Sequence, residues 1–521
     1  MELFHASRRG TRWVRCALVA MLISAGIASA QDLESFKQRT TVHRLDNGWT
    51  FIIVERPEAP VFSYATLANV GSAQEVPGIT GLAHMFEHMA FKGTPNIGTK
   101  DYAAEKKALT AEEAAYQAWQ AERLKAHPDK EALDTLEKAF REKQKEAAQY
   151  VVANEFDDIL SRQGGVGLNA FTNADETGYF FSLPSNKFEL FAFLESERFL
   201  HPVFREFYKE RAVVQEERRM RTESQPIGRL VEAFTSAAFT AHPYHHPVVG
   251  YMSDLQSITI TDARAFFNKY YGPANLVTAI VGDVKAADVI PIIDEYFGRI
   301  PARPAPEPLR TVEPLQTAER EVILRDPAQP FYLEGYHKPA DTGADQPVYD
   351  AIDDILSNGR TSRLYRSLVR DKKIAVATQS LTGYPGQKYP NLWVVYAVPA
   401  KGHTDQEVAD AIHAEIDRLK TEDVTDAELE KFKTRAKARL LRSLDNNQGL
   451  AFQLAEYQRL YGNWQELFRY LDRLDKVTKA DIRRIANETF TESNRTVGMI
   501  VTESPSSSSD DGSAKTSGAE G

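Results

Sequence analysis

The residues with the clearest chemical potential lie in the stretch from Gly81 to Ala90, which reads Gly-Leu-Ala-His-Met-Phe-Glu-His-Met-Ala. His84 and His88 are four residues apart, so on an α-helix both imidazoles lie on one face, one turn apart. Glu87 lies on roughly the same face. Two imidazoles in this arrangement can hold a zinc ion, and the carboxylate can take a proton from a water beside the metal. Two histidines alone do not make a catalytic zinc site, so this chemistry requires a third ligand elsewhere in the chain.

The bulk composition is that of a soluble globular protein. At 521 residues the chain is too long for one ordinary core, which predicts two or more domains. Hydrophobic residues make up 42% and charged residues 26% of the sequence, and both are typical values. The formal net charge of −10 offers no basic surface, so we expect no nucleic-acid partner. No stretch after the N-terminal segment is long and apolar enough for a membrane span, so we expect none in the mature chain.

The first 30 residues have the pattern of a secretory signal peptide. Arginines precede an apolar run from Cys16 to Ile27, and Ala28-Ser29-Ala30 forms a small-x-small cleavage site. A membrane anchor is the alternative, but the apolar run is too short to span a bilayer comfortably. We therefore expect export to the periplasm, by either the general or the twin-arginine route. Cleavage would remove the only cysteine, so zinc in the mature chain must be held by His and carboxylate ligands, which suits a catalytic site.

Local patterns indicate mixed helices and strands. Residues 41–54 alternate around Asp46-Asn47-Gly48, which predicts a β-hairpin, and further strands are predicted at 62–70, 168–172 and 178–183. Residues 103–153 are rich in Ala, Glu and Lys with helical periodicity, interrupted near Pro128, which predicts a helical hairpin. A later helix carries Glu210 and Glu217, which are seven residues apart and therefore share a face.

An internal repeat indicates two similar halves. The segments that begin Ile258-Thr-Ile-Thr-Asp and Val477-Thr-Lys-Ala-Asp each lead through a helix to an Asn and an apolar strand. The offset between the two starts (477 against 258) equals the offset between the two asparagines (494 against 275), so the match contains no gap. Two unrelated units that match by chance are the alternative.

A proline-rich stretch lies between the repeats. We therefore expect a first half over 31–300, a linker over 301–320 and a second half over 321–503. The Ser/Gly/Asp-rich tail over 504–521 has almost no apolar side chains to bury, which predicts disorder.

The motifs together carry a family likeness. They are Gly48 in the Asn-Gly turn, Gly71-Ser72, the His84 to His88 motif, Phe91-Lys-Gly-Thr94, Asn169-Ala-Phe-Thr172 with Thr177 and Tyr179, and Glu210 with Glu217. Over most of residues 41–503 the chain resembles the M16 metallopeptidases, the pitrilysin/insulinase group that includes mitochondrial processing peptidase. The resemblance implies an α+β fold of two homologous α/β halves that enclose a peptide-binding chamber. Each half would be a mostly antiparallel sheet packed with helices, and the first would carry the helical hairpin as an insertion.

The resemblance also implies a third zinc ligand and a supporting carboxylate. In the family the third ligand is a Glu on a later helix, seven residues after another characteristic Glu. This implies one Zn²⁺ per chain, held by His84, His88 and Glu217, with Glu210 as the supporting carboxylate. Glu216 is the competing ligand, and the Glu-Arg-x-x-x-x-x-Glu register favours Glu217. The second histidine and Glu217 lie roughly fifty residues further apart than is usual in the family, and the helical hairpin accounts for this as a surface insertion.

Peptide substrates would bind beside the metal. The resemblance implies that the strand at Asn169-Ala170 is an open edge to which a substrate adds as a further strand. Taken alone, Asn169 is better explained as a turn or strand-end residue that makes local hydrogen bonds. The family often carries an Arg and a Tyr seven residues apart in the second half, which clamp the substrate. Arg370 is the candidate here, but Ala377 stands where the Tyr would be.

The second half departs from the metal pattern. Residues 351–358 lie where a second His-x-x-Glu-His might fall, and they contain no His. Some family members divide the site between a zinc-bearing subunit and a zinc-less sister that supplies the Arg/Tyr pair. The missing Tyr indicates that this chain is the zinc-bearing member of such a pair, with a homodimer as the runner-up. His242, His245 and His246 resemble a second metal cluster, but the neighbouring prolines prevent a helical ladder of ligands, so we interpret them as loop and packing residues.

The expected function is therefore that of an exported zinc-dependent endopeptidase acting on short or unfolded peptides. Glu87 would be the general base and acid for a zinc-activated water, and the chain would be the catalytic subunit of a two-subunit enzyme. A non-catalytic M16-like scaffold subunit is the alternative. Such relatives typically have damaged metal motifs, whereas the motif in this chain is intact.

Overall fold

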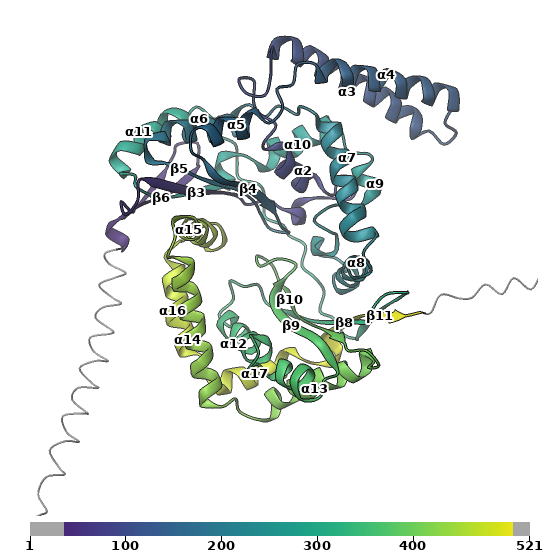
Figure 1. The fold of residues 1–521 in the computed structure, drawn as a ribbon, viewed down its shortest axis with the longest axis vertical. Helices are drawn as coiled ribbons and strands as arrows, with labels where there is room; N and C mark the ends of the chain where they lie inside the picture. The colour runs from purple at the N-terminus through teal and green to yellow at the C-terminus, as the bar shows by residue number, and fades with distance from the viewer. Residues whose placement is uncertain (1–35, 504–521) are drawn as a thin grey trace, which may run out of the picture.

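The computed structural model describes residues 36–503. The predicted signal peptide and the predicted tail lie outside these residues. The described chain forms two halves, each a sheet with helices, one above the other in Figure 1. No helix among the described residues is both long enough and apolar enough to cross a membrane.

The elements of the first half follow one another as β1 (Thr40–Arg44), β2 (Thr50–Glu55), β3 (Val61–Ala68), α2 (Leu82–Met89), α3 (Tyr102–Arg123), α4 (Lys130–Ala148), α5 (Glu155–Arg162), β4 (Val166–Thr172), β5 (Thr177–Pro184), α6 (Phe188–Leu200), α7 (Phe207–Arg218), η3 (Arg219–Glu223), α8 (Pro226–Ala238), α9 (Met252–Leu255), α10 (Ile260–Tyr270), β6 (Leu276–Gly282) and α11 (Ala286–Phe297). Those of the second half are β7 (Arg320–Asp326), β8 (Phe331–Lys338), α12 (Gln346–Ser357), η6 (Tyr365–Asp371), β9 (Ala375–Tyr384), β10 (Asn391–Pro399), α13 (Asp405–Thr421), α14 (Asp426–Ser443), α15 (Asn447–Tyr461), α16 (Glu466–Lys476), α17 (Lys479–Thr489) and β11 (Arg495–Thr502). Residues 301–319, all of them described, form neither helix nor strand between the halves.

Both sheets are mixed but mostly antiparallel, as predicted. In the first sheet the strand order is β1-β2-β6-β3-β5-β4, and only the β2–β6 pair is parallel among the described strands. In the second sheet the order is β7-β11-β8-β10-β9, and only the β7–β11 pair is parallel in the described part of the chain. The two-half α+β architecture is therefore confirmed.

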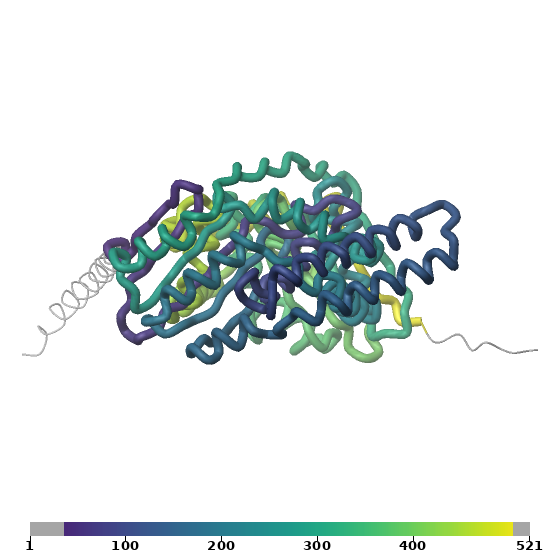
Figure 2. The backbone as a smooth tube through the Cα atoms, turned by 90° about the horizontal axis from the view of Figure 1, so that it is seen from above, coloured from purple at the N-terminus to yellow at the C-terminus, as the bar shows by residue number. Residues whose placement is uncertain are grey.

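The internal repeat extends over more elements than the two segments recognised in the sequence. β7 and β8 follow β2 and β3 at one constant offset (position 320 against 50, and 331 against 61). α17 and β11 follow α10 and β6 at a smaller constant offset (position 479 against 260, and 495 against 276). The stretch that contains α3 and α4 lies between these two parts of the first half, so the helical hairpin accounts for most of the extra length of that half. Figures 1 and 2 show these two antiparallel helices projecting from the body.

Each half supplies one helix to cover the sheet of the other half (Figure 1). Leu450 and Leu454 of α15 are buried against the strands of the first sheet, in one core with Ile52, Leu67 and Val281. In return, Leu230 and Phe234 of α8 are buried against the second sheet, with Leu333, Leu392 and Ile500. Removing these apolar faces from water gives each half a direct share in the core of the other.

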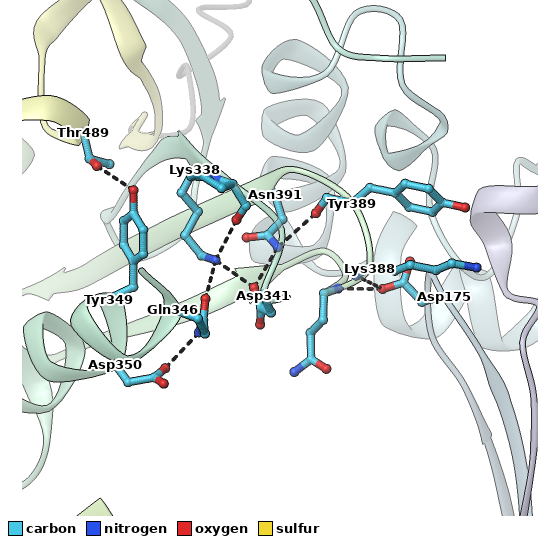
Figure 3. Close-up of polar contacts among 12 residues, drawn as sticks. Asp175, Lys338, Asp341, Gln346, Tyr349, Asp350, Lys388, Tyr389, Asn391 and Thr489 are labelled. Carbon is cyan, nitrogen blue, oxygen red and sulfur yellow. Dashed lines mark hydrogen bonds and ion pairs between the residues drawn. The ribbon is translucent and has the colours of Figure 1, made fainter. Parts of the chain in front are cut away.

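A polar joint also connects the halves at the β4–β5 turn. The buried Asp175 carboxylate accepts hydrogen bonds from the backbone N–H groups of Gln387 and Lys388 in the β9–β10 loop, at 2.6 and 3.0 Å, and from the Tyr244 hydroxyl at 2.6 Å. Figure 3 shows the backbone bonds to Asp175 and, beside them, the buried Lys338 ammonium with its neighbours in the second half. One residue further along the turn, the Glu176 carboxylate forms an ion pair with Arg459 of α15.

Candidate metal centre

Helix α2 presents two opposite faces to its surroundings. Leu82, Met85, Phe86 and Met89 recur at helical spacing and are buried in the core, so the histidines and Glu87 lie on the other side. The first turn is capped from outside the helix. The buried Glu75 carboxylate accepts hydrogen bonds from the N–H groups of Gly81 and Ala83 at 2.8 and 2.7 Å, which satisfies donors that have no partner within the helix.

The backbone at the start of α2 requires a glycine at position 81. Its φ is 93°, in the left-handed region, and a Cβ atom there would lie 2.7 Å from the carbonyl oxygen of Val249. A residue with a side chain is therefore excluded on both conformational and steric grounds.

Helix α7 brings two carboxylates to the polar face of α2. Glu210 and Glu217 are seven residues apart and share one face of α7, and their side chains are only 11% and 15% exposed. Glu216 points elsewhere, because its carboxylate is 57% exposed and pairs with Arg219 on the same helix at 2.7 Å. The geometry therefore favours Glu217 over Glu216 as a partner of the two histidines.

Three potential ligand atoms converge between these helices. Glu217 Oε2 lies 3.7 Å from His84 Nε2 and 3.5 Å from His88 Nε2. One ligand atom from each of the three residues can be chosen so that all lie within 4.8 Å of one another. Donors that bind zinc tetrahedrally at about 2.0–2.1 Å lie about 3.3–3.4 Å apart, so the two measured separations match a common zinc ion closely. The set of two imidazoles and one carboxylate is that of a catalytic zinc site with a position left for water.

Glu210 supports this set from behind. Its Oε2 atom lies 3.6 Å from His88 Nδ1, the ring nitrogen opposite the one that faces Glu217. A carboxylate at the second ring nitrogen fixes the tautomer and orientation of a metal-binding histidine. The arrangement thus matches the supporting role expected for Glu210.

The surroundings shift the pKa values of these groups in different directions. Burial lowers the pKa of His84 to about 4, so its imidazole is neutral and able to bind metal near pH 7. The contact with Glu210 raises the pKa of His88. Burial also raises the pKa of Glu87, against an opposing hydrogen bond from Thr172. A raised carboxyl pKa suits a group that must take up and release a proton.

A cavity of about 280 Å³ opens beside the convergent ligands. It is lined by Glu87 and His88 of α2, Glu206 and Glu210 at the start of α7, Asn169 and Ala170 of β4, and residues 151–156, which follow the helical hairpin. β4 is one of the two edge strands of its sheet within the described part of the chain, and β1 is the other. The structure therefore brings the two predicted substrate-binding residues of the first half next to the predicted metal ligands. Asn169 Oδ1 also accepts a hydrogen bond from its neighbour Ala170 N at 2.9 Å, which is the local role considered from sequence.

Models of known protein families match two parts of the chain, one of which contains α2. The family model described as "Insulinase (Peptidase family M16)" matches residues 50–148, which include α2, and the model described as "Peptidase M16 inactive domain" matches residues 257–436. Together the two models cover more than half of the sequence. The chain belongs to the M16 peptidase family.

Individual members of the M16 family match over nearly the whole chain. A zinc protease, PqqE, from Helicobacter pylori is 28% identical over 92% of this chain and 96% of its own length. The crystal structure of a protease from Helicobacter pylori superposes with a TM-score of 0.74 at 28% identity, covering 89% of this chain and 99% of that one. The beta subunit of the mitochondrial-processing peptidase from Saccharomyces cerevisiae is 22% identical over 89% of this chain and 90% of its own length. The names of these relatives support a zinc peptidase as the general class of this chain.

The second M16 half lacks the metal-binding residues. At the offset that separates β7 from β2, the three residues of the α2 motif correspond to Asp354, Ser357 and Asn358 on and just after α12. At the smaller offset that separates α17 from α10, Glu210 and Glu217 correspond to Leu429 and Ala436 of α14. Within residues 36–503, the group of His84, His88 and Glu217 is the one set of potential metal ligands whose atoms converge this closely.

Neither Arg370 nor the histidine-rich loop lines the cavity beside α2. Arg370 is 53% exposed on η6 of the second half, where its guanidinium pairs with Asp371 at 2.6 Å, and it does not line the cavity beside α2. His242 is buried against the rings of Tyr244 and Tyr389, as expected for a packing residue. These histidines do not form a convergent ligand set within the described residues.

Three residues around the M16 centre were missed by sequence reasoning. Lys92 pairs with Glu210 at 2.5 Å, Arg221 pairs with Glu217, and Glu75 caps α2. Arg221 lies one helical turn after Glu217, a spacing that predicts an ion pair. Lys92 belongs to the Phe-Lys-Gly-Thr motif, but nothing in that motif indicates a contact with Glu210. No local signal identifies Glu75, because it caps the helix from the preceding loop.

Proposed function

We propose that this chain is an exported zinc endopeptidase in which His84, His88 and Glu217 hold one zinc ion per chain. The observation that carries the proposal is the convergence of the three ligand atoms beside a cavity that Glu87 and the edge strand β4 both line. Zinc bound there would supply a Lewis acid that acidifies water and polarises a peptide carbonyl. The predicted signal sequence supports export to the periplasm.

Glu87 is the group that moves the proton. It lies on the same face as the histidines, it lines the cavity, and it is not one of the three convergent ligands. Its carboxylate takes a proton from the attacking water and donates it to the amine that leaves. Proton transfer by a positioned carboxylate contributes about 10²–10⁴-fold to such a reaction. Burial raises the pKa of Glu87, which makes its carboxylate a stronger base toward the attacking water.

The edge strand β4 holds the peptide. An extended peptide can pair with the free side of β4 through its backbone, so that binding makes few demands on side chains. Asn169 and Ala170 lie on this strand next to Glu87 in the cavity, so a paired peptide bond comes within reach of the centre. This arrangement suits short or unfolded peptides, because a folded substrate has no free extended segment to add to the sheet.

The test separates metal binding from catalysis. Glu87→Gln removes the proton carrier but no ligand, so we expect stoichiometric zinc and a loss of peptide cleavage of about 10²-fold or more. His84→Ala removes a ligand, so we expect both zinc and activity to be lost. Metal content is measured by plasma mass spectrometry, and cleavage is measured on an unfolded reporter peptide. Purified Glu87→Gln protein that cleaves at the wild-type rate would overturn the assignment.

The missing Tyr of the expected Arg/Tyr clamp supports a second proposal. It is that the active enzyme has two different M16 subunits. Arg370 has no Tyr seven residues later, because Ala377 occupies that position in β9. We expect the purified chain to be slow alone and to become fast when co-purified with a sister M16 chain that supplies an Arg/Tyr pair. Full activity of the isolated chain, measured alongside size-exclusion chromatography, would contradict this part of the proposal.

A further inference from the structure

The guanidinium of Arg205 uses every hydrogen-bond donor that it has. Arg205 lies just before α7 and is 1% exposed. Its Nε and Nη2 atoms donate to the two oxygens of Glu105 at 2.5 and 2.8 Å. Its Nη1 atom donates to the carbonyl oxygens of Lys92 and Ile97, and Nη2 also donates to that of Thr94. An arginine has five N–H donors in a fixed fork, so all five are satisfied, and no other side chain can reproduce the pattern.

The loop that follows the metal helix is wrapped around this guanidinium. Gly93 and Gly98 have φ values of 89° and 85°, in the left-handed region. A Cβ atom at Gly93 would lie 2.9 Å from Arg205 Nη1, and one at Gly98 would lie 2.7 Å from the same atom. Both positions therefore require glycine, because the backbone must turn closely around Arg205. The path of the chain directly after α2 is set by a side chain that belongs to the start of α7.

The helical hairpin supplies the counter-charge. Glu105 lies in the first turns of α3 and is fully buried with Arg205. A buried guanidinium requires a paired carboxylate, because an isolated charge in the interior is strongly unfavourable. Through this ion pair the inserted hairpin holds the guanidinium around which the loop after the metal helix turns.

The Lys92 side chain continues the connection to the metal centre. While its carbonyl oxygen is held by Arg205, its ammonium contacts Glu210 Oε1 at 2.5 Å and Glu206 Oε2 at 3.3 Å. The other oxygen of Glu210 faces His88 Nδ1 at 3.6 Å. The order of contacts is therefore Glu105, Arg205, the loop at Lys92, Glu210 and His88.

We propose that Arg205 and Lys92 are positioning residues of the metal centre, through which the helical hairpin holds Glu210 in the orientation that directs His88 toward the metal. The inference rests on the proposed zinc peptidase function. Arg205 holds the backbone of Lys92, and the Lys92 ammonium holds one oxygen of Glu210 so that the other remains against His88. Loss of such a supporting carboxylate geometry costs about 10- to 100-fold in metal affinity.

The experiment compares Lys92→Met with Lys209→Met. Both lysines contact Glu206, but only Lys92 contacts Glu210, and Lys209 is 64% exposed. Zinc affinity is measured on metal-free protein by competition with a chromogenic chelator. We expect Lys92→Met to bind zinc about 10- to 100-fold more weakly, with kcat lowered and KM little changed. We expect Lys209→Met to bind zinc within twofold of the wild type.

Four further measurements separate positioning from general stability. Metal-free Lys92→Met protein should keep the circular dichroism spectrum and a cooperative thermal transition of the wild type, whereas a loss of zinc through unfolding would abolish both. Lys92→Arg, which keeps the charge, should recover most of the zinc affinity. Arg205→Lys keeps one charge but has at most three donors in place of five, so it should also weaken zinc binding. Combined with Lys92→Met, it should add little, since both changes act on the same contact.

The outcomes distinguish the inference from the function on which it rests. Wild-type protein that neither binds zinc nor cleaves peptides would refute the proposed function. Wild-type protein that does both, with Lys92→Met and its combination with Arg205→Lys binding zinc within twofold of wild type, would overturn the positioning role alone. Strictly additive losses in the double variant would equally contradict a shared path through Lys92.

Discussion

Replacing Glu176 by glutamine removes one charge from the joint between the two halves. Glu176 ends the turn after the proposed substrate strand β4, and its partner Arg459 lies on α15, which crosses from the second half. The two side chains are 8% and 2% exposed. Within the described residues, Arg459 Nε and Nη1 make no hydrogen bond, so the guanidinium depends on the charge of Glu176. Breaking a buried pair on one side costs about 3–5 kcal/mol, because the remaining charge stays buried.

A nearby carboxyl moderates this cost in a pH-dependent way. Burial and, to a lesser extent, the charge of Glu176 raise the pKa of Glu456 to about 7, against the opposing charge of Arg459. The stabilisation that comes from neutral Glu456 is present below its unfolded pKa of about 4.5 and is lost as the pH rises through about 7. In Glu176→Gln the charge that raises the pKa of Glu456 is gone, so Glu456 ionises at a lower pH. Its stabilisation in the neutral form is then lost at lower pH than in the wild type. The ionised Glu456 partly replaces the missing partner of Arg459. The variant should therefore lose more stability at pH 5.5 than at pH 8.

Thermal unfolding followed by circular dichroism measures the effect. With about 3 kcal/mol lost and a shift of about 2–4 °C per kcal/mol for a unit of 150–250 residues, the midpoint should fall by about 6–12 °C at pH 5.5 and by less at pH 8. The control is Glu58→Gln, whose carboxylate is 63% exposed and lies 3.6 Å from Arg56, so it should change the midpoint by less than about 2 °C. A Glu176→Gln midpoint within the range of the control, or a larger loss at pH 8, would refute the reasoning.

Two further predictions concern the metal ligands and a buried acid of the second half. Glu217→Gln should lose stoichiometric zinc, whereas Glu216→Gln, which disturbs only an exposed pair with Arg219, should keep zinc and activity; metal analysis of both proteins decides between the neighbours. Burial raises the pKa of Asp353 to about 7, against a hydrogen bond from Ser380, so the wild type loses stability as the pH rises from about 3.8 to about 7. Asp353→Asn should remove this pH dependence of stability. Urea unfolding would then show that the free energy of unfolding of the variant, relative to wild type, is higher at pH 8 than at pH 5. An equal difference between the two proteins at both pH values would contradict the prediction.

The local parts of the site could be predicted because their signals are periodic. The spacing of the two histidines and the seven-residue spacing of Glu210 and Glu217 each place side chains on one face of a helix, and both helices form where expected. The repeat offset likewise predicts two halves, and the sheets confirm it. Which of Glu216 and Glu217 faces the histidines was inferred from a family likeness, and the packing of α7 agrees with that choice.

The long-range parts could not be read from spacing. The exchange of α8 and α15 between the sheets depends on contacts between segments far apart in the sequence, and amphipathic periodicity does not say which sheet a helix will cover. The same holds for Asp175, whose partners lie in the β9–β10 loop. A family pattern also has limits as a guide to position. Arg370 was carried over from such a pattern, yet it lies exposed on η6 and does not line the cavity beside α2.

The equivalent helix pairs of the two halves are held together by different polar groups. In the first half, α2 and α7 face each other through two histidines and two carboxylates, a set that a cation between them would hold together. In the second half, the equivalent helices α12 and α14 face each other through Asp354 and Arg435, whose oxygen and nitrogen lie 3.5 Å apart, and Arg435 also donates to the carbonyl oxygen of Asn358 at 3.0 Å. The arginine thus supplies within the chain the positive charge that the proposed metal would supply in the first half. A helix pair held by its own ion pair needs no metal to stay closed, so the second half can hold the β4–β5 turn in place whether or not the first half is loaded.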